Sequence, residues 1–167
     1  MRRRLLAVFR ESGRYEDLLE FLHSTRDALP ADDDGGEERR ALDDEIVRVL
    51  DRGLARSEEA EKLLRRALEL KPDNGSYLDS LGWVYFRRGD VEKALDVLER
   101  ARTISTGEPT INEHLGDVYA RHARRKDAAS SYQRALESLR EDPELAESAG
   151  QRAQIEKKLK ALDASPP

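Results

Sequence analysis

Three histidines are the side chains best suited to acid–base or metal chemistry near neutral pH, and they are scattered along the chain: His23, His114 and His122. His114 and His122 would lie about two helical turns apart, which is too far for a shared metal ion. The chain has no cysteine, which excludes disulfides, thiolate zinc ligands and a cysteine nucleophile. It also lacks a phosphate-binding glycine loop and the GxSxG and HExxH motifs. We therefore predict no enzyme activity, no metal ion and no cofactor.

A run of acidic residues is the next candidate for ion binding. Asp32–Arg40 reads DDDGGEERR, and its three adjacent aspartates invite a calcium interpretation. A calcium-binding loop alternates its ligands and ends in a distal glutamate, and neither feature is present here at the right spacing. A stretch so polar and rich in like charge is typical of a loop that repels itself. We predict an acidic flexible loop over residues 32–40.

Binding is the remaining activity to examine, and the stretch Gly75–Glu108 predicts the scaffold for it: a helix, a tight turn and a second helix. The first half carries residues spaced as one helix face, namely Leu78, Leu81, Gly82 and Tyr85. Gly89 can adopt the left-handed conformation that ends a helix, and Asp90 can cap the next one. A second apolar stripe follows at Val91, Ala94, Leu95, Leu98 and Ala101. Two such helices cannot bury both apolar faces alone, so they need neighbours.

The neighbours follow at a period of 34 residues. The pairs in this register are Leu81 and Leu115, Gly82 and Gly116, Tyr85 and Tyr119, Ala94 and Ala128, Leu98 and Tyr132, and Ala101 and Ala135. A generic helical bundle needs helical periodicity but no fixed repeat length, so the common spacing favours a repeat architecture.

This register resembles the tetratricopeptide repeat family, whose pattern is aromatic, Leu-Gly, Tyr, Gly, Ala, aromatic or Leu, Ala, Pro. The central repeat departs from that pattern at Leu78 and Thr106. The resemblance implies an all-α repeat solenoid, a right-handed superhelix. Gly82 and Gly116 would let helices approach closely, and Tyr85 and Tyr119 would fill the space between helix pairs. Small residues would also stand where the two helices of a pair cross, at Ala94, Ala101, Ala128 and Ala135. The LDSLGW sequence is similar to repeats of bacterial scaffold and envelope-assembly proteins of the family.

We expect four repeats and a C-terminal capping helix in a single domain over residues 1–163. The repeats would span about 1–31, 41–74, 75–108 and 109–142, the capping helix 143–163, and a tail 164–167. A capping helix would cover the open end of the stack, as repeat arrays require. In the last repeat, Thr110 followed by Glu113 is a capping-box pattern that predicts a helix start. Ala123 stands in the place of Gly89, and an alanine in a left-handed turn costs about 1 kcal/mol, so we expect a reshaped turn.

The resemblance also implies where a ligand binds, because in the family the first helix of each pair lines a concave groove. At the groove positions, the two best-preserved repeats hold Asp79, Trp83, Phe86, Arg87, Glu113, Asp117 and Arg121. The same positions of residues 41–74 hold Leu42, Glu45, Val49, Arg52 and Gly53. Trp83 and Phe86 would form an aromatic patch flanked by charges, and aromatic and arginine side chains are the usual anchors of protein interfaces. A role for Trp83 in ordinary core packing is the alternative.

The groove residues also bear on the chemistry of the ligand. Some family members clamp a C-terminal carboxylate with Lys and Asn, but here the corresponding places hold Asp79, Trp83 and Glu113. We therefore predict a non-catalytic scaffold or adaptor whose ligand is an Arg-containing or mixed-charge peptide with an apolar anchor. Two alternatives remain: a homodimer formed through Leu5, Leu6 and Phe9, or a regulatory or C-terminal part of a larger protein.

Charge and hydropathy bound the partner and the location. The net charge of −5 argues against nucleic acid as the main partner. No apolar run has the length of a membrane span, and Leu5–Phe9 is too short for a signal peptide. We expect a cytoplasmic protein, or a periplasmic or envelope-associated one if the chain is a fragment of an exported protein.

Overall fold

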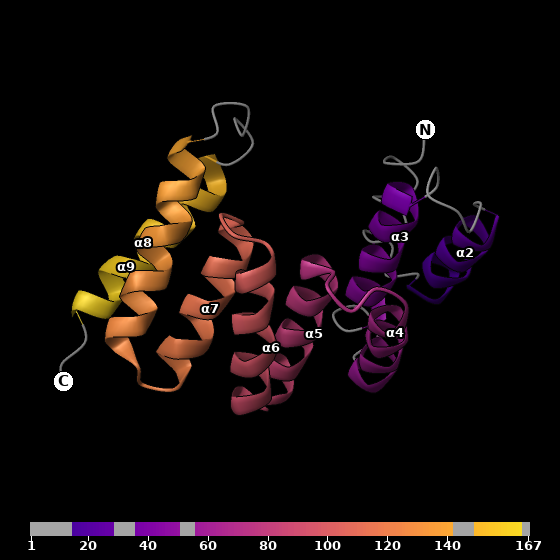
Figure 1. Ribbon diagram of the computed structural model, residues 1–167, viewed down its shortest axis with the longest axis horizontal. Helices are drawn as coiled ribbons and strands as arrows, with labels where there is room; N and C mark the ends of the chain where they lie inside the picture. Colours follow the sequence, from indigo (N-terminus) through magenta and orange to yellow (C-terminus); the bar gives the residue numbers. More distant parts are fainter. Residues whose placement is uncertain (1–14, 29–35, 51–55, 142–148, 165–167) are drawn as a thin grey trace. The chain divides into compact units, whose positions relative to one another are not determined.

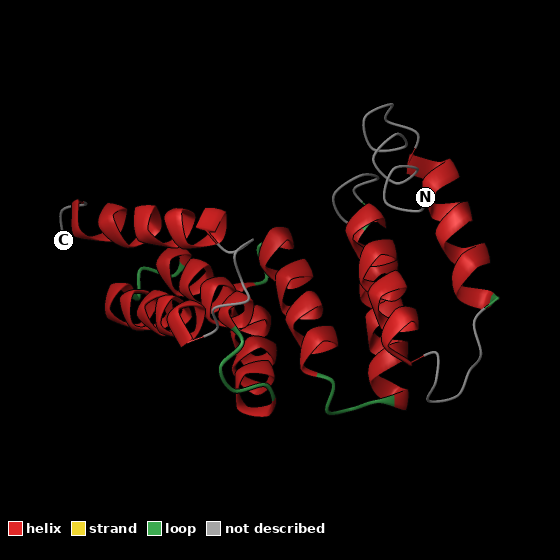
Figure 2. Ribbon diagram, turned by 90° about the horizontal axis from the view of Figure 1, so that it is seen from above, coloured by secondary structure: helices red, strands yellow, loops and turns green. Residues whose placement is uncertain are grey.

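The computed structural model describes residues 15–28, 36–50, 56–141 and 149–164 (Figure 1). Every regular element in those ranges is a helix, which confirms the predicted all-α repeat class (Figure 2). The helices gather into two compact units, Met1–Leu70 and Lys71–Pro167, and each unit is described by itself. The division falls between two repeats, because each repeat of such an array packs only against its neighbours.

The first unit contains three described helices: α2 (Tyr15–Asp27), α3 (Gly36–Arg48) and α4 (Ser57–Leu70). α2 packs against α3, and α3 packs against α4. The core of this unit includes Leu18, Leu22, Leu42, Ile46, Val47, Ala60 and Leu64, all buried. Arg26 of α2 also reaches Asp43 of α3, with the charged atoms 3.4 Å apart.

Two expectations for the first unit need correction. α3 begins at Gly36, so residues 36–40 are helical where we expected the acidic loop. The residues from Glu37 to Ala41 are mostly good helix formers, which explains the earlier start. Leu42 and Val49 are buried, and Glu45 is buried beside Arg48, so these residues do not line an open surface. The expectations for Leu5, Leu6, Phe9, Asp32, Asp33, Asp34, Arg52 and Gly53 lie outside the described residues.

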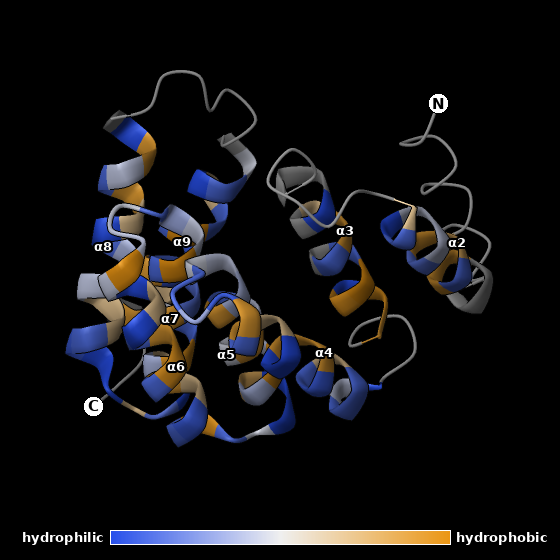
Figure 3. Ribbon diagram, turned by 45° about the vertical axis from the view of Figure 1, so that its right-hand side comes forward, coloured by the Kyte–Doolittle hydropathy of each residue, from blue (hydrophilic) through white to orange (hydrophobic). Residues whose placement is uncertain are grey.

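The second unit is a row of helical hairpins. Its helices are α5 (Gly75–Arg88), α6 (Val91–Ile104), α7 (Pro109–Arg121), α8 (Arg125–Glu141) and α9 (Ala149–Ala164). α5 packs with α6 and α7 packs with α8, while α6 also lies against α7 and α9 against α8 (Figure 1). Apolar segments gather where α6, α7 and α8 come together (Figure 3). Of the capping helix expected over residues 143–163, the structure describes the part that belongs to α9, from Ala149 onward. Residues 142–148 lie outside the described ranges.

Small residues sit where the helices of each pair approach most closely. Ala94, Ala101, Ala128 and Ala135 are completely buried. A Cβ atom added to Gly82 would lie 2.4 Å from Cγ of Leu98. A Cβ atom added to Gly116 would lie 2.3 Å from the ring of Tyr132. These contacts are shorter than van der Waals packing allows, so the predicted role of the two glycines is confirmed.

The turn between α7 and α8 keeps the geometry of the turn between α5 and α6. Gly89 has a φ of 88°, and its N–H and that of Asp90 donate to carbonyls of the last turn of α5 at 3.0 and 2.9 Å. Ala123 has a φ of 57°, and its N–H and that of Arg124 make the same pair of bonds to α7 at 3.2 and 2.9 Å. The expectation of a reshaped turn is therefore wrong. The two backbone bonds hold Ala123 in a conformation that an isolated alanine avoids.

The helix starts differ from the expected capping chemistry. α7 begins at Pro109, whose fixed φ suits a first helical position. Thr110 and Glu113 form no capping box, because the N-cap of α7 is Glu108 and Thr110 lies inside the helix; Glu113 bonds side chains of α9. Asp90 stands at the N-cap of α6 without a side-chain cap bond. A cap that the sequence reading missed is Asn74, whose side chain accepts from the N–H of Tyr77 at 3.0 Å.

Candidate functional site

An aromatic cluster bridges the first helices of two successive repeats. Trp83 and Phe86 lie three residues apart on α5, so they share a face of that helix. Their ring centroids are 5.1 Å apart, at an interplanar angle of 40°. The indole of Trp83 also stacks on the imidazole of His114 from α7, with centroids 4.1 Å apart and planes at 22°. All three rings are only partly buried, so the aromatic cluster of Trp83, Phe86 and His114 reaches the surface.

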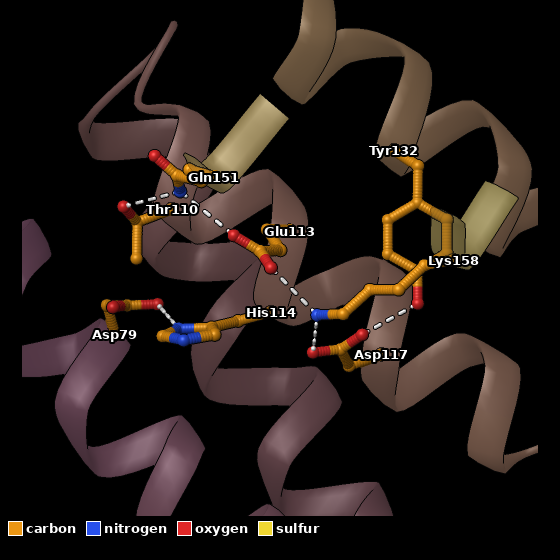
Figure 4. A network of polar contacts seen from close by, with 8 residues as sticks. All are labelled: Asp79, Thr110, Glu113, His114, Asp117, Tyr132, Gln151 and Lys158. Atoms are coloured by element: carbon orange, nitrogen blue, oxygen red, sulfur yellow. Dashed lines mark hydrogen bonds and ion pairs between the residues drawn. The ribbon is translucent and has the colours of Figure 1, made fainter. Parts of the chain in front are cut away.

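Asp79 fixes the imidazole of this cluster. The carboxylate lies on α5, one turn before Trp83, and its Oδ1 is 2.8 Å from Nδ1 of His114 (Figure 4). A carboxylate at this distance orients the ring. The stack and the hydrogen bond together join α5 to α7 at two points.

Two arginines border the cluster on the side of the helix C-termini. Arg87 and Arg121 occupy the last turns of α5 and α7, and both side chains are exposed. They are 34 residues apart, so they hold the same repeat position. The guanidinium carbon of Arg121 lies 6.0 Å from the ring centroid of Phe86, at the limit of a cation–π contact.

Glu113 and Asp117, the remaining predicted groove residues, are engaged by α9 and α8. Nζ of Lys158 lies 2.7 Å from a carboxylate oxygen of each (Figure 4). Gln151 donates to Glu113 at 2.9 Å, and the hydroxyl of Tyr132 donates to Asp117 at 2.7 Å. We call this group, with Thr110 at 3.4 Å from Gln151, the α9 network.

Titration of the α9 network follows from its packing. Burial and the hydrogen bond to Asp117 raise the pKa of Tyr132 well above its ordinary value of 10.0. For Lys158, burial acts to lower the pKa, but the hydrogen bonds to Asp117 and Glu113 outweigh it and raise the pKa above 10.5. Both groups therefore keep their protons near neutral pH, and Lys158 is a cation between two carboxylates.

The structure thus divides the seven predicted site residues. Asp79 and Trp83 contact His114, Phe86 contacts Trp83, and Arg121 lies beside Phe86, while Arg87 is exposed on α5. Glu113 and Asp117 belong to the α9 network instead. His114, Gln151 and Lys158 are the residues that the sequence reading missed. Only His114 had a usable signal, since it falls one position past the place in the next repeat that matches Asp79.

Trp83 has one unusual feature. Its indole Nε1 is buried and has no hydrogen-bond acceptor among the described residues. A buried donor without a partner costs about 1–3 kcal/mol. The tilted ring contact with Phe86 and the stack on His114, rather than a hydrogen bond, therefore hold this ring in place.

Two further observations concern other kinds of site. Within the described ranges, no group of three or more His, Asp or Glu side chains is placed to hold a metal ion. No helix in those same ranges has the length and apolar character that crossing a membrane requires.

Comparison with known proteins was made for sequence and for structure. Residues 50–109 and residues 113–147 each match the tetratricopeptide repeat, and together these ranges exceed half of the chain. The TPR repeat-containing protein YpiA of Bacillus subtilis (strain 168) is 30% identical over 89 residues, which are 53% of this chain and 21% of that protein. The chain therefore spans about a fifth of the length of this relative.

Solved structures with the same fold include SycD, PcrH and the Sgt2 TPR domain. SycD, a type III secretion translocator chaperone of Yersinia enterocolitica, superposes with a TM-score of 0.66 at 16% identity, over 81% of this chain and 96% of SycD. PcrH of Pseudomonas aeruginosa superposes with a TM-score of 0.66 at 18% identity, over 81% of this chain and 96% of PcrH. The Sgt2 TPR domain of Aspergillus fumigatus superposes with a TM-score of 0.58 at 22% identity, over 70% of this chain and 78% of that domain. At these identities the likeness shows the fold. The repeat register, the helical hairpins and the matches to residues 50–109 and 113–147 agree, and the chain is a tetratricopeptide repeat protein.

Proposed function

We propose that this chain is a non-catalytic scaffold or adaptor that binds a peptide or protein segment on one face of α5 and α7. We call this surface the α5–α7 face and define it by Asp79, Trp83, Phe86, Arg87, His114 and Arg121. The observation that carries the proposal is the aromatic cluster, which bridges two successive first helices and stays partly exposed.

The make-up of this face suits protein recognition. Tryptophan and arginine are enriched among the residues that dominate binding energy at interfaces, and truncating one of them typically costs 2 kcal/mol or more. The indole is held before any ligand arrives by its stack on His114, whose imidazole is in turn hydrogen-bonded to the carboxylate of Asp79. Such preorganisation reduces the entropy lost on binding.

The structural relatives support the same use of the fold. SycD has been solved with a peptide of the translocator YopD, and PcrH with the chaperone binding region of PopD. YopD and PopD are ligands of SycD and PcrH, and neither is proposed as a ligand of this chain. The two complexes support a peptide or protein segment as the class of partner, in keeping with the resemblance of the LDSLGW repeat to bacterial scaffold proteins.

In this proposal Glu113 and Asp117 have a supporting role. Their carboxylates join α7 to Lys158 of α9 and to Tyr132 of α8, which fixes the helix that presents His114. Their loss would act on a ligand indirectly, through the position of α7. The homodimer alternative rests on Leu5, Leu6 and Phe9, which lie outside the described residues, so it stays a prediction. Measuring the molar mass of the protein in solution at several concentrations would test it.

A selection from a random peptide display library tests the proposal. Peptides enriched on the full chain should lose affinity about tenfold or more for Trp83→Ala, a variant that should remain helical. Arg134→Ala is the matched control, because Arg134 is an exposed arginine of α8 away from this face. Enriched peptides that bind Trp83→Ala and the wild type equally would place the binding surface elsewhere and contradict the proposal.

A further inference from the structure

The acidic side chains around the α5–α7 face are already satisfied within the protein. The side chains of Asp79, Glu113 and Asp117 are 13%, 11% and 16% exposed. Asp79 bonds His114, while Glu113 and Asp117 share the ammonium of Lys158. A basic ligand residue would have to break these contacts, and removing one partner from a largely buried pair is costly. The expectation of an Arg-containing ligand therefore finds no available carboxylate here.

An exposed cation, Arg121, lies beside the aromatic cluster on this face. Arg87 and Arg121 project from equivalent last turns, and both are exposed. Arg121 lies beside the ring of Phe86, where its guanidinium borders the aromatic cluster. A guanidinium presents donors in a fork that matches a carboxylate, and stacking on a ring leaves those in-plane donors available.

From this arrangement we infer that the ligand of the α5–α7 face is an acidic peptide segment, in which an apolar or aromatic anchor packs on Trp83 and Phe86 and a neighbouring carboxylate pairs with Arg121. The inference rests on the proposed function and names the chemistry of its ligand. The 6.0 Å between Arg121 and the ring of Phe86 sets the spacing. An extended chain advances about 3.3–3.6 Å per residue, so the acidic residue lies within about two residues of the anchor.

A short acidic peptide suits this face better than a polyanion does. Nucleic-acid sites need a continuous basic patch or stripe, and the chain as a whole carries a net charge of −5. One or two carboxylates beside an apolar anchor need only the local arginines. The selectivity would come from the contrast between the engaged acids and the exposed guanidinium of Arg121 beside the aromatic cluster.

The test uses a pool of short synthetic peptides, each with one central Trp, Phe or Leu and flanks randomised over Glu, Gln, Lys, Ala and Ser. The pool is captured on the full chain and sequenced, and fluorescence anisotropy then compares matched peptides that differ only in Glu, Gln or Lys beside the anchor. We expect Glu to be enriched within two residues of the anchor, and the Glu peptide to bind about tenfold more tightly than its Gln counterpart.

Variants of Arg121 separate the inference from general charge effects. Arg121→Gln should remove the preference for Glu and leave the Gln peptide unchanged, while Arg121→Lys should restore part of it. Arg134→Gln removes the same charge on α8 and should change neither peptide. Enrichment of Lys, or a Glu preference that survives Arg121→Gln, would overturn the inference and leave the proposed function standing. Capture of no anchored peptide above a Trp83→Ala control would contradict the proposed function itself.

Discussion

The indole of Trp83 stacks on the imidazole of His114, which joins α5 to α7 across the boundary between two repeats. The sequence left open whether Trp83 belongs to a binding surface or to the core. The geometry shows features of both, because the ring contacts a neighbouring helix and is nevertheless only partly buried. A residue in this position can couple ligand binding to the fit between repeats.

Replacing Trp83 with a smaller ring separates its two roles. Trp83→Phe keeps an aromatic side chain and removes a buried N–H that has no acceptor among the described residues. We expect the free energy of unfolding to change by less than about 1 kcal/mol, since the lost area and the removed penalty oppose each other. Urea unfolding followed by circular dichroism measures this, because Trp83 is the one tryptophan of the chain and fluorescence is lost with it. A loss above about 3 kcal/mol, in the range of Trp→Ala core substitutions, would make Trp83 a core residue.

The two inter-helix turns offer a matched pair of substitutions. Ala123→Gly should stabilise the protein by up to about 1 kcal/mol, because glycine adopts a positive φ without the steric cost that alanine has. Gly89→Ala should destabilise it by about 1 kcal/mol for the opposite reason. A Cβ at Gly89 would meet no atom within 4 Å, so the effect there is conformational and not a clash. Thermal unfolding of both variants checks the pair, and shifts of the same sign would contradict this explanation.

The helix crossings predict a strong dependence on side-chain size. Ala94 is completely buried between helices, so Ala94→Leu should overpack the crossing and cost about 1–3 kcal/mol of stability. Ala153→Leu on α9 makes the same change at an exposed helical position and should be close to neutral. Chemical unfolding of the two variants side by side is the measurement. Equal effects would mean that Ala94 does not lie at a tight crossing.

The α9 network predicts a loss of stability at alkaline pH. The pKa values of Tyr132 and Lys158 are both raised in the folded protein, so the folded state keeps these protons to higher pH than the unfolded chain does. Their contribution is complete below the ordinary values of 10.0 and 10.5 and is lost as the pH rises above them. Tyr132→Phe has no phenol to ionise, so its stability should fall less steeply above about pH 10. Parallel curves for Tyr132→Phe and the wild type would show that Tyr132 does not titrate in this way.

The parts predicted correctly from the sequence are those that repeat. The 34-residue register located the hairpins of α5 to α8, the left-handed turn at Gly89 and the close contacts of Gly82 and Gly116. Each depends on residue size or backbone freedom at a fixed repeat position, and both properties follow from the identity of a single residue. The same register also placed Trp83 and Phe86 on a shared helix face.

What the sequence could not supply depends on contacts between elements of different period. Lys158 reaches Glu113 and Asp117 only because α9 returns against α8, and no 34-residue spacing relates α9 to α7. The residue types alone therefore suggested exposed acids and an Arg-containing or mixed-charge ligand, whereas the structure shows Glu113 and Asp117 held by an internal lysine. The turn at Ala123 illustrates the reverse case, since backbone hydrogen bonds outweigh a local preference of about 1 kcal/mol.

Amide hydrogen exchange of the full chain, with and without a peptide enriched in the selection, tests the central claim most directly. If the ligand binds the α5–α7 face, the amides of α5 and α7 around Trp83 and His114 should exchange more slowly when the peptide is present. The amides of α4, which is not part of that face, should exchange at the same rates with and without the peptide. Protection confined to α2, α3 or α4, with α5 and α7 unchanged, would contradict the proposed binding face.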